Sequence, residues 1–197
     1  MNRWSKIVLA VLLASGEARS DEPKPTDRLS DVRFLVGRWN GTSDGQAGRG
    51  SVSRVYEPVL NGRYIHERNR SEYPAQPANP KGEVHEHWSF LSYDKIRQTV
   101  VLRQFHVEGF VNTYRLLPRN GTDKRLVFES EQIENLPGDW KARETYEQIS
   151  QDEFTETFQL AEPGKEFQTY SKNHFKRTAG QAKVLDATPQ ERYFTLH

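Results

Sequence analysis

Leu35-Val36-Gly37-Arg38-Trp39-Asn40-Gly41-Thr42 is the stretch on which the fold depends. A short amphipathic run over 27–36 predicts a short helix before the first strand. Gly37 ends that run, and a strand begins at about Trp39. From there to Arg177 the sequence alternates between strands and turns, without a second helical pattern of useful length. This order favours an all-β protein over a parallel βαβ fold.

About ten strands are expected, separated by turns rich in Gly, Pro, Asn and Asp. Their predicted bounds are 38–42, 51–59, 63–72, 83–91, 98–107, 110–117, 124–133, 140–149, 153–160 and 166–177. The stretch 43–50, with three glycines, is expected to be a mobile loop. The Asn61-Gly62 pair is typical of a two-residue hairpin turn. The sequence therefore predicts a single antiparallel meander β-barrel over 27–178, with a short N-terminal helix before its first strand.

Composition limits the classes of partner. The chain has 197 residues, which suits one domain, and its formal net charge is +1. Such a small charge gives no electrostatic reason to expect nucleic-acid binding. The chain has no cysteine, so disulfide bonds are excluded. A small-molecule ligand is the partner class that remains for a barrel.

The N-terminus resembles a secretory signal peptide. Arg3 and Lys6 precede an apolar run over 7–14, and Ala18-Arg19-Ser20 matches a small-x-small cleavage site. We expect a signal over 1–20, a flexible lead-in over 21–26 and a tail of unassigned role over 179–197. The apolar run is shorter than the ~20 residues that a spanning helix needs. The expected location is therefore secreted or periplasmic, with no membrane span after cleavage; a core helix or membrane anchor is the alternative.

Alternation along each strand lets one face be chosen as the interior, and the aromatic faces are the natural choice. The side chains expected to contact a ligand are Tyr64, His66, Arg68, Glu86, Trp88, Arg103, Phe105, Tyr114, Glu144, Tyr146, Phe154, Glu156 and Phe158. Buried charges must pair or face a wet cavity, and a ten-stranded barrel has room for one. Arg68 and Arg103 would then meet an anionic group of the ligand. Charges at the barrel mouths, or closed salt bridges without a ligand, are the alternative.

His85-x-His87 places two imidazoles on one strand face, a spacing that can bind zinc or iron. His106 or His66 could supply a third ligand. Because Trp88, on the opposite face of the same strand, is assigned to the interior, both histidines are expected to face solvent, and no metal site is predicted.

Catalytic motifs are missing from the sequence, so no catalytic residue is assigned and enzymatic activity is left open. Glu144 and Glu156, on adjacent strands, could act as paired carboxylates. A salt bridge from either glutamate to Arg68 or Arg103 is the simpler expectation.

Gly37-Arg38-Trp39 after a short helix resembles the Gly-x-Trp signature of lipocalins and related calycins. This resemblance implies that Trp39 closes the barrel floor and packs under Arg177 at the end of the last strand. The strand count is similar to that of fatty-acid-binding proteins and nitrobindin-like haem barrels. Segments 58–64, 90–94, 108–111 and 149–154 also resemble a family of secreted bacterial proteins, which implies a fold and not a function.

The nitrobindin-like resemblance implies haem held by a His on the last strand, with nitric-oxide or peroxynitrite chemistry. Here that region reads Gln168-Thr169-Tyr170-Ser171, and His174 has the opposite parity to Arg177, so it is expected to point outward. The sequence thus predicts a barrel without a cofactor, holding a partly polar or anionic hydrophobic ligand. A haem barrel and a scaffold or interaction module without a ligand are the alternatives.

Overall fold

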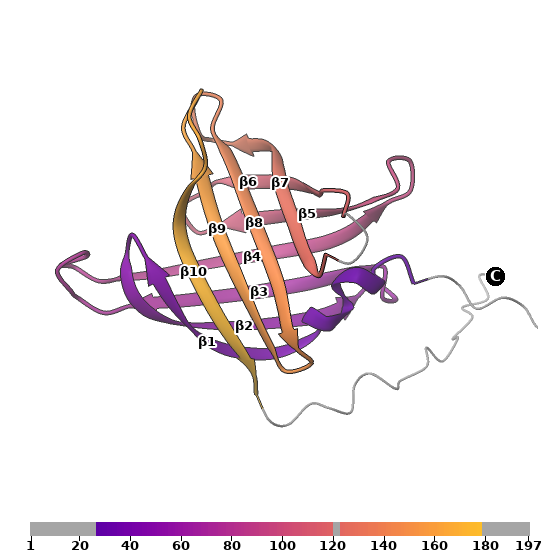
Figure 1. Ribbon diagram of the computed structural model, residues 1–197, viewed down its shortest axis with the longest axis horizontal. Coiled ribbons are helices and arrows are strands. Elements are labelled where there is room, and N and C mark those ends of the chain that lie inside the picture. Colours follow the sequence, from indigo (N-terminus) through magenta and orange to yellow (C-terminus); the bar gives the residue numbers. More distant parts are fainter. Residues whose placement is uncertain (1–26, 120–122, 179–197) are drawn as a thin grey trace, which may run out of the picture.

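The computed structural model describes residues 27–119 and 123–178. Ten antiparallel strands form one closed barrel, in which each strand pairs with the next and β10 pairs with β1 (Figure 1). The elements are η1 (Ser30–Leu35), β1 (Gly37–Gly45), β2 (Gly48–Val59), β3 (Tyr64–Tyr73), β4 (Glu83–Asp94), β5 (Thr99–His106), β6 (Val111–Leu116), β7 (Arg125–Glu134), β8 (Lys141–Ser150), β9 (Glu153–Ala161) and β10 (Gln168–Arg177). The predicted all-β barrel of about ten strands is confirmed.

One local expectation is wrong, and a second differs in length. The stretch expected to be a mobile loop is part of β1 and β2, which pair down to Gly45 and Gly48 and leave two residues in the turn. Gly48 permits this turn because its φ is +91°, a conformation that other residues rarely adopt. The amphipathic run before β1 contains a six-residue 3₁₀ helix, η1, which is shorter than the helix expected over 27–36.

The two ends of the barrel are different. The helix end carries η1 and the turns that lead into the odd-numbered strands (Figure 1). Here Leu29, Val32 and Leu35 pack with Trp39 in the hydrophobic core. The opposite end, which we call the pocket end, carries the turns between β1 and β2, β3 and β4, β5 and β6, β7 and β8, and β9 and β10. Because the strands are consecutive and antiparallel, these five turns must lie together.

Aromatic side chains fill the helix end. The rings of Trp39 and Phe154 meet edge to face with centroids 4.7 Å apart, and Phe154 stacks on Phe175 at 4.6 Å. Phe128 and Tyr146 add a second edge-to-face pair at 5.9 Å. All five side chains are buried, so this half of the barrel is packed by its own residues and any cavity must lie toward the other end.

Three predicted segments lie outside the described residues: the signal over 1–20, the lead-in over 21–26 and the tail over 179–197. Within the described ranges, no helix is long and apolar enough to cross a membrane.

Candidate functional site

A cavity of about 480 Å³ lies at the pocket end. Its polar lining comes mainly from β2 to β5 and includes Arg54, Asn69, Ser71, His85, His87 and His106. Its apolar lining comes mainly from β7, β9 and the segment between β7 and β8, and includes Ile133, Leu136, Trp140, Phe158 and Leu160. The wall from β2 to β5 can therefore form hydrogen bonds, whereas the opposite side combines this apolar patch with the polar side chains of Glu144, Glu156 and Asn173.

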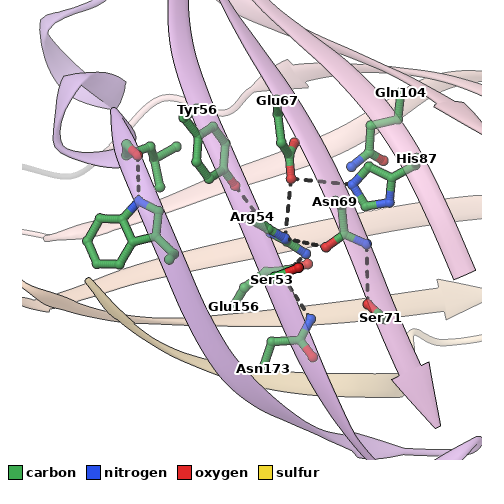
Figure 2. Close-up of polar contacts among 12 residues, drawn as sticks. Ser53, Arg54, Tyr56, Glu67, Asn69, Ser71, His87, Gln104, Glu156 and Asn173 are labelled. Carbon is green, nitrogen blue, oxygen red and sulfur yellow. Dashed lines mark hydrogen bonds and ion pairs between the residues drawn. The ribbon is translucent and has the colours of Figure 1, made fainter. Parts of the chain in front are cut away.

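Arg54 on β2 lines the cavity and lies among the partners of a buried polar network (Figure 2). Its Nη2 contacts Glu156 Oε2 at 2.5 Å, and its Nε lies 3.2 Å from Glu67 Oε1. Nε also donates to Asn69 Oδ1 at 2.8 Å, while Asn173 Nδ2 donates to Glu156 Oε2 at 2.9 Å. These buried groups come from β2, β3, β9 and β10, so the network ties the two walls of the barrel together.

Glu67 is fully buried and remains ionised. Burial alone would raise the pKa of its carboxyl, but the Arg54 guanidinium and His87 hold this pKa down at about 2. A buried charge of this kind is tolerated because it is paired and hydrogen-bonded. The single positive charge of Arg54 is thus shared by two carboxyl groups, those of Glu67 and Glu156.

Glu144 on β8 is in a different electrostatic state. Burial, and then the charge of Glu156, raises the pKa of its carboxyl to about 8. Gln104 Nε2 donates to its Oε1 at 2.7 Å, and the Tyr146 hydroxyl makes a very short hydrogen bond to its Oε2. At neutral pH Glu144 therefore holds a proton for most of the time, and it presents a neutral carboxyl to the cavity.

Three histidines form a cluster on the polar wall. His85 and His87 lie two residues apart on β4, and His106 on β5 is the direct cross-strand neighbour of His87. The ring centroids of the three pairs are 5.3–5.5 Å apart. One ring nitrogen from each residue lies within 4.8 Å of the others. The barrel therefore converges three imidazoles on one point beside the cavity.

Each of these imidazoles also has a polar contact with a residue outside the cluster. His85 Nδ1 lies 2.8 Å from Glu108 Oε1, and His87 Nε2 lies 3.3 Å from Glu67 Oε1. His106 Nε2 lies 3.1 Å from the Asn112 amide nitrogen. Burial, followed by the charges of His87 and His85, lowers the pKa of His106 to about 3. His106 is consequently neutral at physiological pH and has a lone pair available.

Six of the residues predicted to contact a ligand do point inward. Glu144, Glu156 and Phe158 line the cavity itself. Tyr114, Tyr146 and Phe154 lie deeper, among the packed aromatic side chains. The inward faces expected on β6 to β9 therefore match the structure.

The faces expected for β3, β4 and β5 are wrong. The predicted contact residues on these strands lie on the outer face of the barrel: Tyr64, His66, Arg68, Glu86, Trp88, Arg103 and Phe105. Arg68 pairs with Glu57 at 3.0 Å, and Arg103 donates to Ser92 Oγ at 3.3 Å, both near solvent. Trp88 is 58% exposed. The inner face carries Glu67, Asn69, His87 and Gln104, among other polar residues.

These errors have one physical cause. The rule that aromatic residues face inward assumes a dry interior, whereas β3 to β5 border a polar cavity. The hairpin between β2 and β3 offered a usable signal. It pairs Tyr56 with Glu67 and Arg54 with Asn69, and cross-strand partners share a face. Had the inward face of β2 been assigned first, the pairing would have placed Glu67 inside.

The last strand lacks the histidine that the haem resemblance requires. β10 turns Ser171, Asn173 and Phe175 toward the interior. His174 has the opposite parity, and its Nε2 lies 2.5 Å from Glu153 Oε1. The residues of β10 therefore do not fit a haem iron held from that strand.

Comparisons with known proteins extend only to the fold. The barrel is similar to the crystal structure of Rv2717c from M. tuberculosis, with a TM-score of 0.57 and 17% sequence identity. The match covers 77% of this chain and 97% of that one. No family model matches the sequence, and no curated protein matches it either.

Proposed function

We propose that the barrel binds a small, partly polar hydrophobic molecule in the cavity at its pocket end. The observation that carries this proposal is that one cavity combines an apolar patch with buried hydrogen-bonding groups. Ligand sites in proteins typically combine such surfaces, since apolar area supplies affinity and a few fixed polar groups supply orientation.

Unsatisfied polar atoms support a ligand with hydrogen-bonding groups. Among the described residues, Gln104 Oε1, Asn112 Oδ1 and Asn173 Oδ1 are buried without a hydrogen-bond partner in the protein. All three belong to inward-facing residues, and Asn112 and Asn173 line the cavity. Buried acceptors normally bind a donor, which here would be water or the ligand. Donor groups such as hydroxyls or amides would suit these positions.

Charge favours a neutral ligand over an anionic one. Arg68 and Arg103, expected to meet an anionic group, lie outside the barrel. Arg54 does line the cavity, but its guanidinium is already shared by Glu67 and Glu156. An added anion would compete with these carboxylates in a low-dielectric site, which is unfavourable.

The proposal is tested by thermal shift and native mass spectrometry on the purified protein. The probe panel contains fatty alcohols, fatty acids, isoprenoid alcohols and aromatic amides and acids. We expect neutral amphiphiles to raise the melting temperature and to appear as a 1:1 complex. No binding across the panel, or binding restricted to acids, contradicts the proposal.

Two phenylalanines provide a matched pair of variants. Phe158→Arg places a charge in the cavity wall and should abolish binding, whereas Phe105→Arg changes the outer face and should leave it intact. Leu136→Arg, in the turn between β7 and β8, repeats the test at a site outside the strands. If all three variants bind equally, the ligand does not occupy this cavity.

A haem barrel is the alternative from family resemblance, and a scaffold without a ligand is the other. Without an inward His on β10, haem would need an iron ligand from another strand. A haemin titration that gives no Soret shift removes this alternative. A barrel without a ligand can fill its interior with side chains. The presence of a cavity therefore favours a binding function over a scaffold function.

The proposed site of action is outside the cytoplasm. This rests on the signal-like sequence of residues 1–20 alone. N-terminal sequencing of the protein recovered from the periplasm or medium should begin at Asp21. Recovery of the intact N-terminus in the cytoplasm would contradict it.

A further inference from the structure

We propose that His85, His87 and His106 bind one divalent transition-metal ion, with zinc as the first candidate, and that its remaining coordination position faces the cavity. The inference does not depend on the small-molecule ligand proposed above. Three histidine ligands with an open fourth position make up a known type of zinc site. All three side chains line the cavity.

The strand geometry brings the ligands together. On a strand, residues i and i+2 share a face, and a directly paired residue on the next strand lies beside them. His85, His87 and His106 occupy these three positions on β4 and β5. Rigid paired strands hold the three Cα atoms in place, so only the imidazole rings need to adjust when a metal binds.

The distances are close to those of a tetrahedral centre. Zinc–nitrogen bonds of 2.0–2.1 Å place two ligand nitrogens about 3.4 Å apart. His85 Nε2 and His87 Nδ1 are 3.3 Å apart. The converging nitrogens of the full set lie within 4.8 Å of one another, so the widest gap must close by at most about 1.4 Å. Rotation of the half-buried His106 ring can supply this movement.

Hydrogen bonding on the outer side of the rings supports a cation between them. A neutral imidazole has one N–H. If His85 Nδ1 donates to Glu108, and His87 Nε2 donates to Glu67, the two facing nitrogens both present lone pairs at 3.3 Å. Two facing lone pairs repel unless a proton or a metal ion lies between them. Carboxylates bound to the distal N–H of zinc-binding histidines are a common feature of metal sites.

The charge balance of the interior also favours a cation. The buried residues of the described ranges include one guanidinium, Arg54, and three carboxyls, Glu67, Glu144 and Glu156. Acidic side chains therefore outnumber the guanidinium in the described interior. A metal ion held by His87, beside Glu67, would offset this excess of acidic groups. A shared proton would do so as well, and the experiment must distinguish the two.

The experiment uses the purified protein after treatment with a chelator and dialysis. Zinc is titrated by calorimetry, bound metal is counted by mass spectrometry, and Co²⁺ serves as a spectroscopic probe. We expect one Zn²⁺ per chain and visible Co²⁺ bands of the intensity typical of tetrahedral nitrogen ligation. The substitutions His87→Ala and His106→Ala should each weaken zinc binding by on the order of 10²-fold or more, since each removes one of three protein ligands.

The chain supplies its own controls. His66→Ala and His174→Ala remove histidines on the outer face and should leave the affinity unchanged. Glu108→Gln alters an exposed group and does not threaten folding; it should weaken binding about 10–100-fold through the His85 contact. Circular dichroism confirms that each variant is folded. Phe158→Arg, which should lose the small-molecule ligand, should still bind zinc. The two proposals can therefore fail independently of each other.

Several outcomes would overturn the inference. Equal losses in the inner and outer histidine variants would indicate surface binding. Less than one ion per chain at saturating zinc would mean that a proton occupies the space between the rings. Haemin binding that is lost with His87→Ala or His106→Ala, without any binding of Zn²⁺ or Co²⁺, would assign the cluster to haem iron instead.

Discussion

The guanidinium of Arg177 lies 4.0 Å from the ring centroid of Trp39 and joins the last strand to the first at the helix end. Its Nη1 donates to the carbonyl of Val36 at 2.7 Å, and its Nη2 donates to the carbonyl of Phe34 at 3.0 Å. The Trp39 indole N–H donates to the Leu35 carbonyl at 2.6 Å. Cation–π stacking and these hydrogen bonds fix η1 against the closed end of the barrel.

Arg177→Lys should therefore destabilise the protein although it keeps the charge. A lysine cannot stack as a plane or donate in two directions, so we expect a loss of about 2–4 kcal/mol in the free energy of unfolding. Urea denaturation measures it. Arg143 stacks on Phe167 and pairs with Glu129 near the surface, and Arg143→Lys should cost less than about 1 kcal/mol. Equal stability of Arg177→Lys and wild type would mean that the closure does not depend on the guanidinium.

Arg54→Met should be among the most damaging single substitutions. It leaves Glu67 and Glu156 buried without their shared cation, and breaking a buried ion pair in this way costs about 3–5 kcal/mol. Adding Glu67→Gln and Glu156→Gln should restore part of this loss, because both unpaired charges are removed. Denaturant titration of the single, double and triple variants measures the coupling. A triple variant no more stable than Arg54→Met would show that packing, and not charge, explains the loss.

Glu144→Gln should change how stability depends on pH. Folding raises the pKa of Glu144 from 4.5 to about 8, so the folded state favours the protonated carboxyl. Its contribution is fully present below pH 4.5 and declines as the pH rises to about 8. Glutamine mimics the neutral form, and the stability of the variant relative to wild type should increase by roughly 2–5 kcal/mol across that window.

Unfolding free energies at several pH values measure this change. Glu147 lies on the outer face of the same strand, and Glu147→Gln is the matched control, for which we expect a flat difference. A flat difference for Glu144→Gln as well would mean that the buried carboxyl titrates normally.

Two tryptophans test the inside and outside of the barrel. Trp39 is 1% exposed and Trp88 is 58% exposed. Trp39→Ala should cost about 3–5 kcal/mol in unfolding free energy, as expected for deletion of a buried aromatic ring. Trp88→Ala should cost less than about 1 kcal/mol and should leave ligand and zinc binding unchanged. A large effect of Trp88→Ala on binding would support the inward placement of Trp88 that the sequence predicted and the structure contradicts.

Local sequence was sufficient for most strands, although it missed the two-residue turn between β1 and β2. Turn residues mark the ends of strands, as Asn61-Gly62 does between β2 and β3, where the turn has four residues and not the expected two. The absence of a second helical pattern leaves a meander as the simplest topology. The inward faces of β8 and β9 could also be assigned, because Phe154 and Tyr146 alternate with polar residues there. These features depend on the backbone geometry of a few neighbouring residues, and a sequence displays them directly.

The side chains that line the cavity could not be predicted in the same way. The sequence by itself determined an antiparallel barrel of about ten strands and supplied the histidines and glutamates. Only the tertiary structure decided that His85, His87 and His106 face inward while Trp88 and Phe105 face outward. The physical reason is that closure of the ring fixes the face of every strand at once, through pairing between strands far apart in the sequence, such as β1 with β10. A one-residue change in parity reverses a whole strand, and local hydrophobicity is a poor guide where the interior is polar.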